Sequence, residues 1–95
     1  MAAYVIANVD VKDPAAYEPY REPAAASVKK FGGKYIVRGG KHEVLEGKWT
    51  PARLVVLEFP SMDHVKRWYE SEEYRKVKPI RLKHAVSDLV LVEGL

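Results

Sequence analysis

The stretch that decides the fold is AYVIANVDVKDPAAY, residues 3–17. Residues 3–10 are rich in β-branched and aromatic side chains, which favour a strand. Asp13 is a good helix N-cap, and Pro14 suits the first helical position because its missing N–H would have no partner there. The stretch therefore predicts a strand that leads directly into a helix.

The helix is expected to reach about residue 31. Its apolar face follows intervals of three and four residues through Tyr17, Tyr20, Ala24, Val28 and Phe31. Pro19 and Pro23 oppose a straight helix, so we expect a kink or a restart near Pro23. Gly32 is the expected left-handed residue that ends the helix.

A second set of strands and helices is predicted further along the chain. A strand at 34–38 is interrupted by Gly39 and Gly40, and residues 41–46 can continue it. A strand at 52–59 follows, stopped by Pro60. Ser61 and Ser71 can cap helices, Pro79 can open a last short helix, and a final strand covers 88–93.

The predicted order is β-α-β-β-α-β within one domain, residues 1–95. This is the α+β, ferredoxin-like sandwich: a four-stranded antiparallel sheet with both helical regions on one face. Because crossovers between parallel strands are right-handed, the first and third strands are expected at the centre.

Alternation along the strands sorts their side chains onto two faces. The face expected under the helices carries Val5, Ala7, Val9, Tyr35, Val37, Val55, Leu57, Phe59, Val90 and Val92. The opposite face is expected to be apolar in its middle, through Ile6, Ile36, Leu54, Val56, Leu89 and Leu91. A monomer rarely exposes such a patch. We therefore predict a homodimer through the sheet face, as a dimeric α/β barrel, with a different partner protein as the alternative.

Composition excludes several classes of protein. The 95 residues are 47% hydrophobic and 31% charged, as in a soluble globular domain. The net charge of +3 is too mild to indicate nucleic-acid binding. No cysteine is present, which excludes disulfides and thiolate chemistry. No apolar run approaches the roughly 20 residues of a membrane span. We expect no secretory signal, and we expect a cytoplasmic location.

Three polar residues are expected on the apolar open face: Asn8, Arg38 and Glu58. An amide, a guanidinium and a carboxylate facing a partly buried space can hold a small polar ligand or tune a general base. The alternative is a structural Arg38–Glu58 ion pair. Arg53, beside a turn, is a further candidate ligand-binding residue, as part of a lid; alternatively it covers the end of the core.

His42 follows the glycine break and is, with Glu58, a candidate catalytic acid or base. The alternative is a polar residue on an edge hairpin. No two histidines have the spacing of metal ligands, so we expect neither a metal site nor a cofactor. The segment RGGK, residues 38–41, lacks the spacing of a phosphate-binding loop, and its glycines favour a bulge or a sharp bend.

Several segments together resemble the domain of unknown function thirteen-thirty family, within the dimeric α/β barrel superfamily. They are YVIANVDVKDPAAYEPY, FGGKYIVRGGKHEVLEG, ARLVVLEFPSMDHVKRWYESEEYRKVKPIR and LVLVEG. The resemblance implies a small ferredoxin-like protein that dimerises through its sheet, and it attaches no catalytic role to any residue. We expect a protein that binds or transforms a small organic molecule near the dimer interface without metal. The alternative is a non-catalytic dimeric ligand-binding or interaction module.

Overall fold

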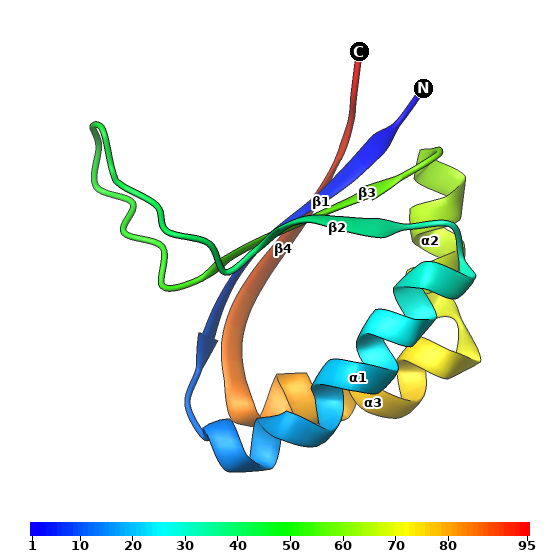
Figure 1. The fold of residues 1–95 in the computed structure, drawn as a ribbon, viewed down its shortest axis with the longest axis horizontal. Helices are drawn as coiled ribbons and strands as arrows, with labels where there is room; N and C mark the ends of the chain where they lie inside the picture. The colour runs from blue at the N-terminus through cyan, green and yellow to red at the C-terminus, as the bar shows by residue number, and fades with distance from the viewer.

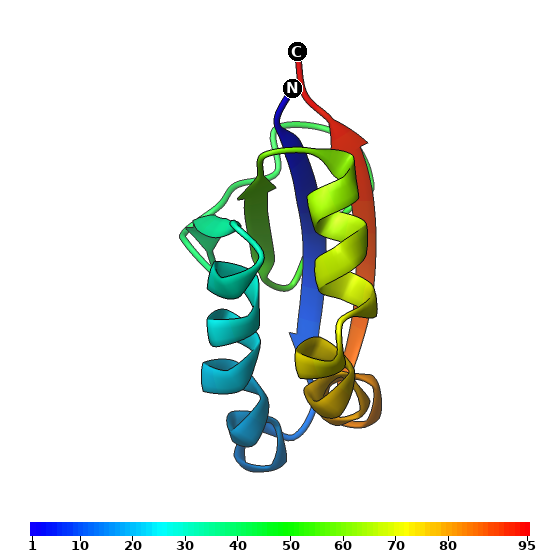
Figure 2. The same cartoon turned by 90° about the vertical axis from the view of Figure 1, so that its right-hand side faces the viewer.

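The computed structural model describes residues 1–95 and confirms the predicted order of elements. These are β1 (Ala3–Val11), α1 (Pro14–Lys30), β2 (Lys34–Arg38), β3 (Leu54–Phe59), α2 (Met62–Glu70), α3 (Glu72–His84) and β4 (Ala85–Glu93). The antiparallel sheet has the order β2-β3-β1-β4, with the first and third strands at its centre. All three helices lie on one face of the sheet (Figures 1 and 2).

The helices begin at the residues that the sequence indicates. The Asp13 carboxylate accepts the Ala16 N–H at 3.2 Å, and the hydroxyls of Ser61 and Ser71 cap α2 and α3 in the same way. Gly32 follows α1 with a φ of +83°, a conformation that glycine adopts without the strain a side chain would bring.

The predictions of a break near Pro23 and of a separate helix at Pro79 are wrong. Helix α1 runs through Pro19 and Pro23, and α3 runs through Pro79. A proline leaves the carbonyl four residues earlier without its N–H partner. Those carbonyls belong to Ala15, Pro19 and Arg75, which are exposed, so water can satisfy them.

The prediction of which β4 side chains lie under the helices is also wrong. Leu89 and Leu91 face the helices, whereas Val90 and Val92 lie on the open face. The reason is the register, which pairs Leu91 with Val5, and paired residues point to the same side of a sheet. Both sets are apolar, so alternation alone cannot choose between them.

The core between sheet and helices is built on aromatic side chains. Phe59 and Trp68 pack with ring centroids 5.4 Å apart, and Trp68 and Tyr74 with centroids 4.4 Å apart. The Trp68 indole N–H donates to the Ser27 hydroxyl at 3.0 Å, so the one polar atom of this ring is satisfied inside the core.

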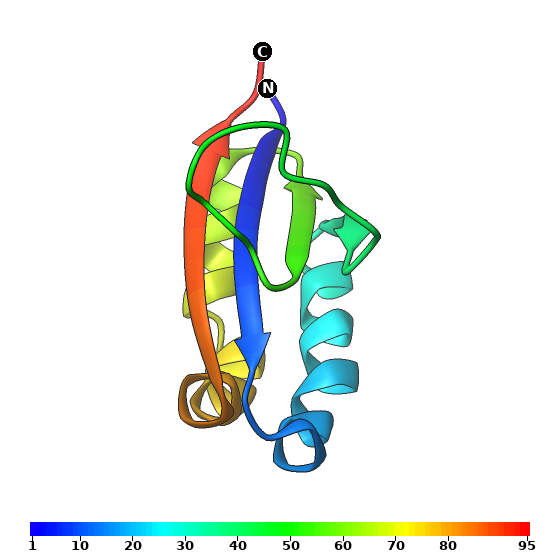
Figure 3. The ribbon, with the colours of Figure 1, turned by 90° about the vertical axis from the view of Figure 1, so that its left-hand side faces the viewer.

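Residues 39–53 form a long arm between β2 and β3, which is continuous irregular chain rather than an extension of β2 over residues 41–46. The arm projects away from the helices, in front of the open face of the sheet (Figures 1 and 3). Leu45 and Trp49 are exposed on it. No helix of the chain has both the length and the apolar character to cross a membrane.

Gly33, the second glycine after α1, offers a test of how the core is packed. A Cβ on Gly33 would lie 2.5 Å from a ring carbon of the buried Phe59, so Gly33→Ala is expected to lower the free energy of unfolding by about 1–3 kcal/mol. Gly40→Ala is the matched control, because a Cβ there meets nothing within 4 Å. Urea unfolding of both variants checks this; equal stabilities would contradict the packing described.

Candidate functional site

A register shift in β2 decides where its last side chains point. Tyr35 pairs with Leu57, but Val37 pairs with Val56 and Arg38 with Val55, because one residue bulges between Tyr35 and Val37. Beyond the bulge the alternation is inverted. Arg38 therefore lies on the helix side with Val55, and Val37 lies on the open face. The predicted faces of both residues are wrong for this reason.

The structure consequently does not bring Asn8, Arg38 and Glu58 together. The Asn8 side-chain oxygen accepts the backbone N–H groups of Ala52 and Arg53, at 2.8 and 3.3 Å, and so fixes the end of the arm. Glu58 stays on the open face, 3.3 Å from the Lys34 amine. A hydrogen bond to Glu58 also raises the pKa of the Tyr4 hydroxyl. No Arg38–Glu58 ion pair forms.

His42 lies on the exposed arm, where its Nε2 is 3.0 Å from the Pro51 carbonyl oxygen. Neither His42 nor Glu58 lines the cavity described next. Their catalytic roles stay predictions for the open face and the arm. No three histidine, aspartate or glutamate side chains come together in a way that could hold a metal ion.

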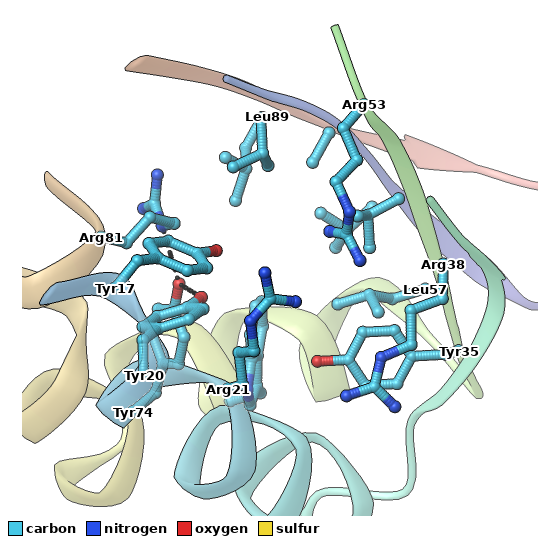
Figure 4. Close-up of a pocket in the computed structure, with 15 residues that line it drawn as sticks. Tyr17, Tyr20, Arg21, Tyr35, Arg38, Arg53, Leu57, Tyr74, Arg81 and Leu89 are labelled. Atoms are coloured by element: carbon cyan, nitrogen blue, oxygen red, sulfur yellow. Dashed lines mark hydrogen bonds between the residues drawn. The ribbon is translucent and has the colours of Figure 1, made fainter. Parts of the chain in front are cut away.

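A cavity lies between the sheet and helices α1 and α3 (Figure 4). The space open to the centre of a water molecule is about 60 Å³. By that measure one water needs about 10–15 Å³, so the cavity holds roughly four to six waters, about the room of one aromatic ring. Its apolar walls come from the sheet and the aromatic core: Val5, Ala7, Val9, Val55, Leu57, Leu89 and Trp68.

The polar lining of the cavity is cationic and phenolic. It consists of Arg21, Arg38, Arg53 and Arg81 together with Tyr17, Tyr20, Tyr35 and Tyr74. No aspartate or glutamate lines it. Of the four arginines only Arg21 has a carboxylate partner, Glu18 at 3.1 Å, which is on the exposed side of α1. The cavity therefore has a surplus of positive charge.

Contacts near the end of β2 and the start of β3 position the side chains of Arg38 and Arg53. The Arg38 guanidinium carbon lies 4.3 Å from the centre of the Tyr35 ring, a cation–π contact. Arg53 passes directly over Gly39, since a Cβ on that glycine would lie 2.5 Å from the Arg53 Nε. Arg53 and Arg38, both candidates from the sequence, thus lie at the same end of the cavity (Figure 4).

Arg81 is buried in α3, with 4% of its surface exposed. Its Nε donates to the Tyr74 hydroxyl at 3.1 Å and its Nη1 donates to Ser87, but no carboxylate pairs with it. Burial by itself lowers the pKa of Arg81, yet the hydroxyls of Tyr74, Tyr20 and Tyr69 raise it overall. The guanidinium therefore stays charged inside the protein.

Three tyrosines of the cavity, Tyr17, Tyr20 and Tyr35, stay protonated. Burial raises the pKa of Tyr17, although Arg21, Arg53 and Arg81 lower it in part. Burial, together with Tyr74, raises the pKa of Tyr20 well above its usual range, and burial also raises that of Tyr35. The site therefore offers neutral phenols beside permanent cations.

The sequence analysis missed Tyr17, Tyr20, Arg21 and Arg81 as site residues. A signal was present: Arg21 follows Tyr17 by four residues, and Arg81 follows Tyr74 by seven, which places each arginine on the buried face of its helix. Arg21 has the acidic Glu18 three residues before it, but Arg81 has no acidic residue three or four positions away. An arginine in that setting among core positions indicates a cationic site rather than a structural ion pair.

A second groove, of about 320 Å³, lies between α2 and β4 and shares Val5, Trp68 and Leu89 with the first. Its only charged residues are Lys66 and Glu70, whose charges cancel. The groove therefore lacks the charge surplus that distinguishes the arginine-lined cavity.

The sequence model of the family described as "Domain of unknown function (DUF1330)" matches residues 2–95. No curated protein matches the chain. Among solved structures, the chain is similar to a protein of unknown function from Rhodopseudomonas palustris, RPA0582, with 19% identity, a TM-score of 0.79, and coverage of 99% of this chain and 82% of that one.

Two further structures share the fold. SnoaB, a cofactor-independent oxygenase from Streptomyces nogalater, has 14% identity and a TM-score of 0.65 over 99% of this chain and 93% of its own. A putative antibiotic biosynthesis monooxygenase from Caulobacter crescentus CB15 has 16% identity and a TM-score of 0.68, over 99% and 90%. At these identities the likeness shows the ferredoxin-like fold alone.

The hydroxyls of the cavity offer a test of the site's construction. Tyr74→Phe leaves the buried Arg81 Nε without its acceptor, so the free energy of unfolding is expected to fall by about 1–3 kcal/mol. Tyr17→Phe is the control, because no protein atom is hydrogen-bonded to the Tyr17 hydroxyl, and it should stay within about 0.5 kcal/mol of wild type. Urea unfolding measures both; similar losses in the two variants would refute the assignment.

Proposed function

We propose that this chain, which belongs to the DUF1330 family, binds a small organic anion in the cavity between its sheet and its helices. The observation that carries the proposal is the cavity lining, in which four arginines face one small space that no carboxylate shares. The proposed ligand supplies the negative charge that the protein does not.

The energetics of buried charge support this assignment for Arg81. A guanidinium removed from water needs a paired anion or full hydrogen bonding, and the buried Arg81 reaches only two neutral hydroxyls. Arg53 is partly buried and Arg38 is exposed, and neither has a carboxylate partner, so both are available to an anion that enters from water. A carboxylate or similar anion can accept paired N–H groups from a guanidinium, which is the geometry that favours arginine in anion sites.

The apolar walls and the small volume of the cavity limit the kind of ligand that can bind. Aliphatic side chains from three strands and the Trp68 ring make most of the surface, and the space is about that of one ring. The proposed ligand is therefore a small aromatic or cyclic acid. Its chemistry on this protein, binding alone or transformation, would take place without a metal held by the lining residues, because arginine, tyrosine and aliphatic groups are poor metal ligands.

A binding experiment tests the proposal. Benzoate is expected to bind at least tenfold more tightly than the neutral benzamide, because each charge-assisted hydrogen bond contributes about 1.5–3 kcal/mol. Arg53→Gln and Arg38→Gln should each weaken benzoate binding about tenfold or more, measured by titration calorimetry. Arg67→Gln on the exposed side of α2 is the control. Equal affinities for the acid and the amide would overturn the proposal.

We further propose that two copies of the chain pair through the open face, as expected from the sequence. Ile36, Val90 and Val92 are 47, 58 and 43% exposed there, an apolar surface that water does not favour. The face carries both signs of charge, including Lys34 and Glu58, so it can be complementary to its own copy. The arm projects over the same side and can extend the contact (Figure 3).

The dimer is tested by oligomeric state. Val90→Asp places a charge within the apolar open face and is expected to give a monomer by light scattering at micromolar concentration, where the wild type is expected to be a dimer. Leu82→Asp, an equally exposed leucine on α3, is the control and should remain a dimer. A monomeric wild type would refute the pairing and would favour a different partner protein or a free face.

A further inference from the structure

The end of the cavity opposite Arg38 and Arg53 is formed by tyrosines. Figure 4 shows Tyr17, Tyr20 and Tyr74 gathered beside Arg81, with Arg21 between this tyrosine end and the arginine end. Tyr17 and Tyr20 come from α1, while Tyr74 and Arg81 come from α3. The two ends differ in chemistry, since one offers free cations and the other neutral hydroxyls.

Arg81 fixes the direction of one hydrogen bond at the tyrosine end and favours one direction for the next. Arg81 can only donate, so the Tyr74 oxygen accepts from it at 3.1 Å. The Tyr74 and Tyr20 oxygens lie 2.6 Å apart. Either oxygen could donate, but the Tyr74 oxygen already accepts from a cation, which makes Tyr74 the better donor of the pair. This favours donation from Tyr74 to Tyr20 and leaves the proton of Tyr20 for the cavity, which both residues line.

The Tyr17 hydroxyl is a second group without a protein partner. Tyr17 is only 4% exposed, and none of the hydrogen bonds of the protein uses its oxygen. In Figure 4 that oxygen points into the cavity. The cavity is open to solvent and no buried polar atom lacks a partner, so water reaches this oxygen, and a ligand in the cavity can bond to it in place of water. Unlike the proton of Tyr20, the Tyr17 hydroxyl can both donate and accept.

From these two groups we infer that the tyrosine end binds a second oxygen of the ligand, a hydroxyl or carbonyl across the ring from its anionic group. The inference rests on the proposed function and narrows it to hydroxy- or oxo-substituted aromatic acids. The anionic group lies with Arg38 and Arg53, and the second oxygen accepts the proton of Tyr20 and meets the hydroxyl of Tyr17. Arg81 acts through Tyr74 as a positioning residue that favours this direction.

The test compares benzoate with 3- and 4-hydroxybenzoate by titration calorimetry. Wild type is expected to bind at least one hydroxybenzoate about three- to tenfold more tightly than benzoate, the effect of one added hydrogen bond. Tyr17→Phe and Tyr20→Phe should each reduce this preference, measured as the ratio of hydroxybenzoate affinity to benzoate affinity in the same variant. Tyr69→Phe, whose ring lies outside this cavity, should keep the preference.

The outcomes separate the two proposals. If none of the three acids binds wild type, the proposed function fails. If benzoate binds but neither hydroxybenzoate binds more tightly, or if the preference survives in both Tyr17→Phe and Tyr20→Phe, the inference about the tyrosine end fails while the anion site stands. Tyr17→Phe keeps the test valid if Tyr20→Phe does not fold, because the Tyr17 hydroxyl supports no other part of the protein.

Discussion

The buried guanidinium of Arg81 is the constraint on which the site depends. A charge with 4% of its surface exposed and no carboxylate partner must be held by neutral hydrogen-bond acceptors. Tyr74 and Ser87 supply them, and Tyr74 in turn orders Tyr20. This chain of contacts joins α1, α3 and β4, so the side chains that hold the fold together also shape one end of the cavity. Stability and the proposed binding site are therefore linked.

The other end of the cavity depends on a single backbone irregularity. One bulged residue in β2 turns Arg38 from the open face to the helix side, where it joins Arg53. Without the bulge, Arg38 would pair with Leu54, and its guanidinium would lie on the open face of the sheet, away from Arg53. The register shift thus brings this cation to the helix side, where no carboxylate lines the cavity.

Much of the fold could be predicted from the sequence because its signals are local. Asp13, Ser61 and Ser71 cap the helices that they were expected to cap, and the order of elements leaves one arrangement of the sheet. The predicted helix breaks at the prolines were wrong. A proline leaves a backbone carbonyl of the preceding turn without its N–H partner, but a carbonyl on the exposed side of a helix can bind water instead. The sequence did not show which side of β4 lies under the helices, because both sides of this strand are apolar.

The site was harder to predict because it is made by register and by long-range contacts. Arg53 was a candidate, and Arg38 was a candidate on the wrong face, since no sequence signal marks the bulge. Tyr17 and Tyr20 read as ordinary core aromatics, because helical spacing does not show that an oxygen faces a cavity. The absence of a carboxylate, which gives the cavity its charge, becomes visible only when four separate segments are assembled.

The central claim is that the arginine-lined cavity takes an organic anion. The most direct measurement follows the side-chain Nε–Hε signals of the arginines by nuclear magnetic resonance while benzoate is added. The account predicts that the signals of Arg38, Arg53 and Arg81 shift with one common dissociation constant, while those of Arg67 and Arg75, which lie outside the cavity, do not. Shifts of the exposed arginines alone, or equal small shifts of all of them, would contradict it.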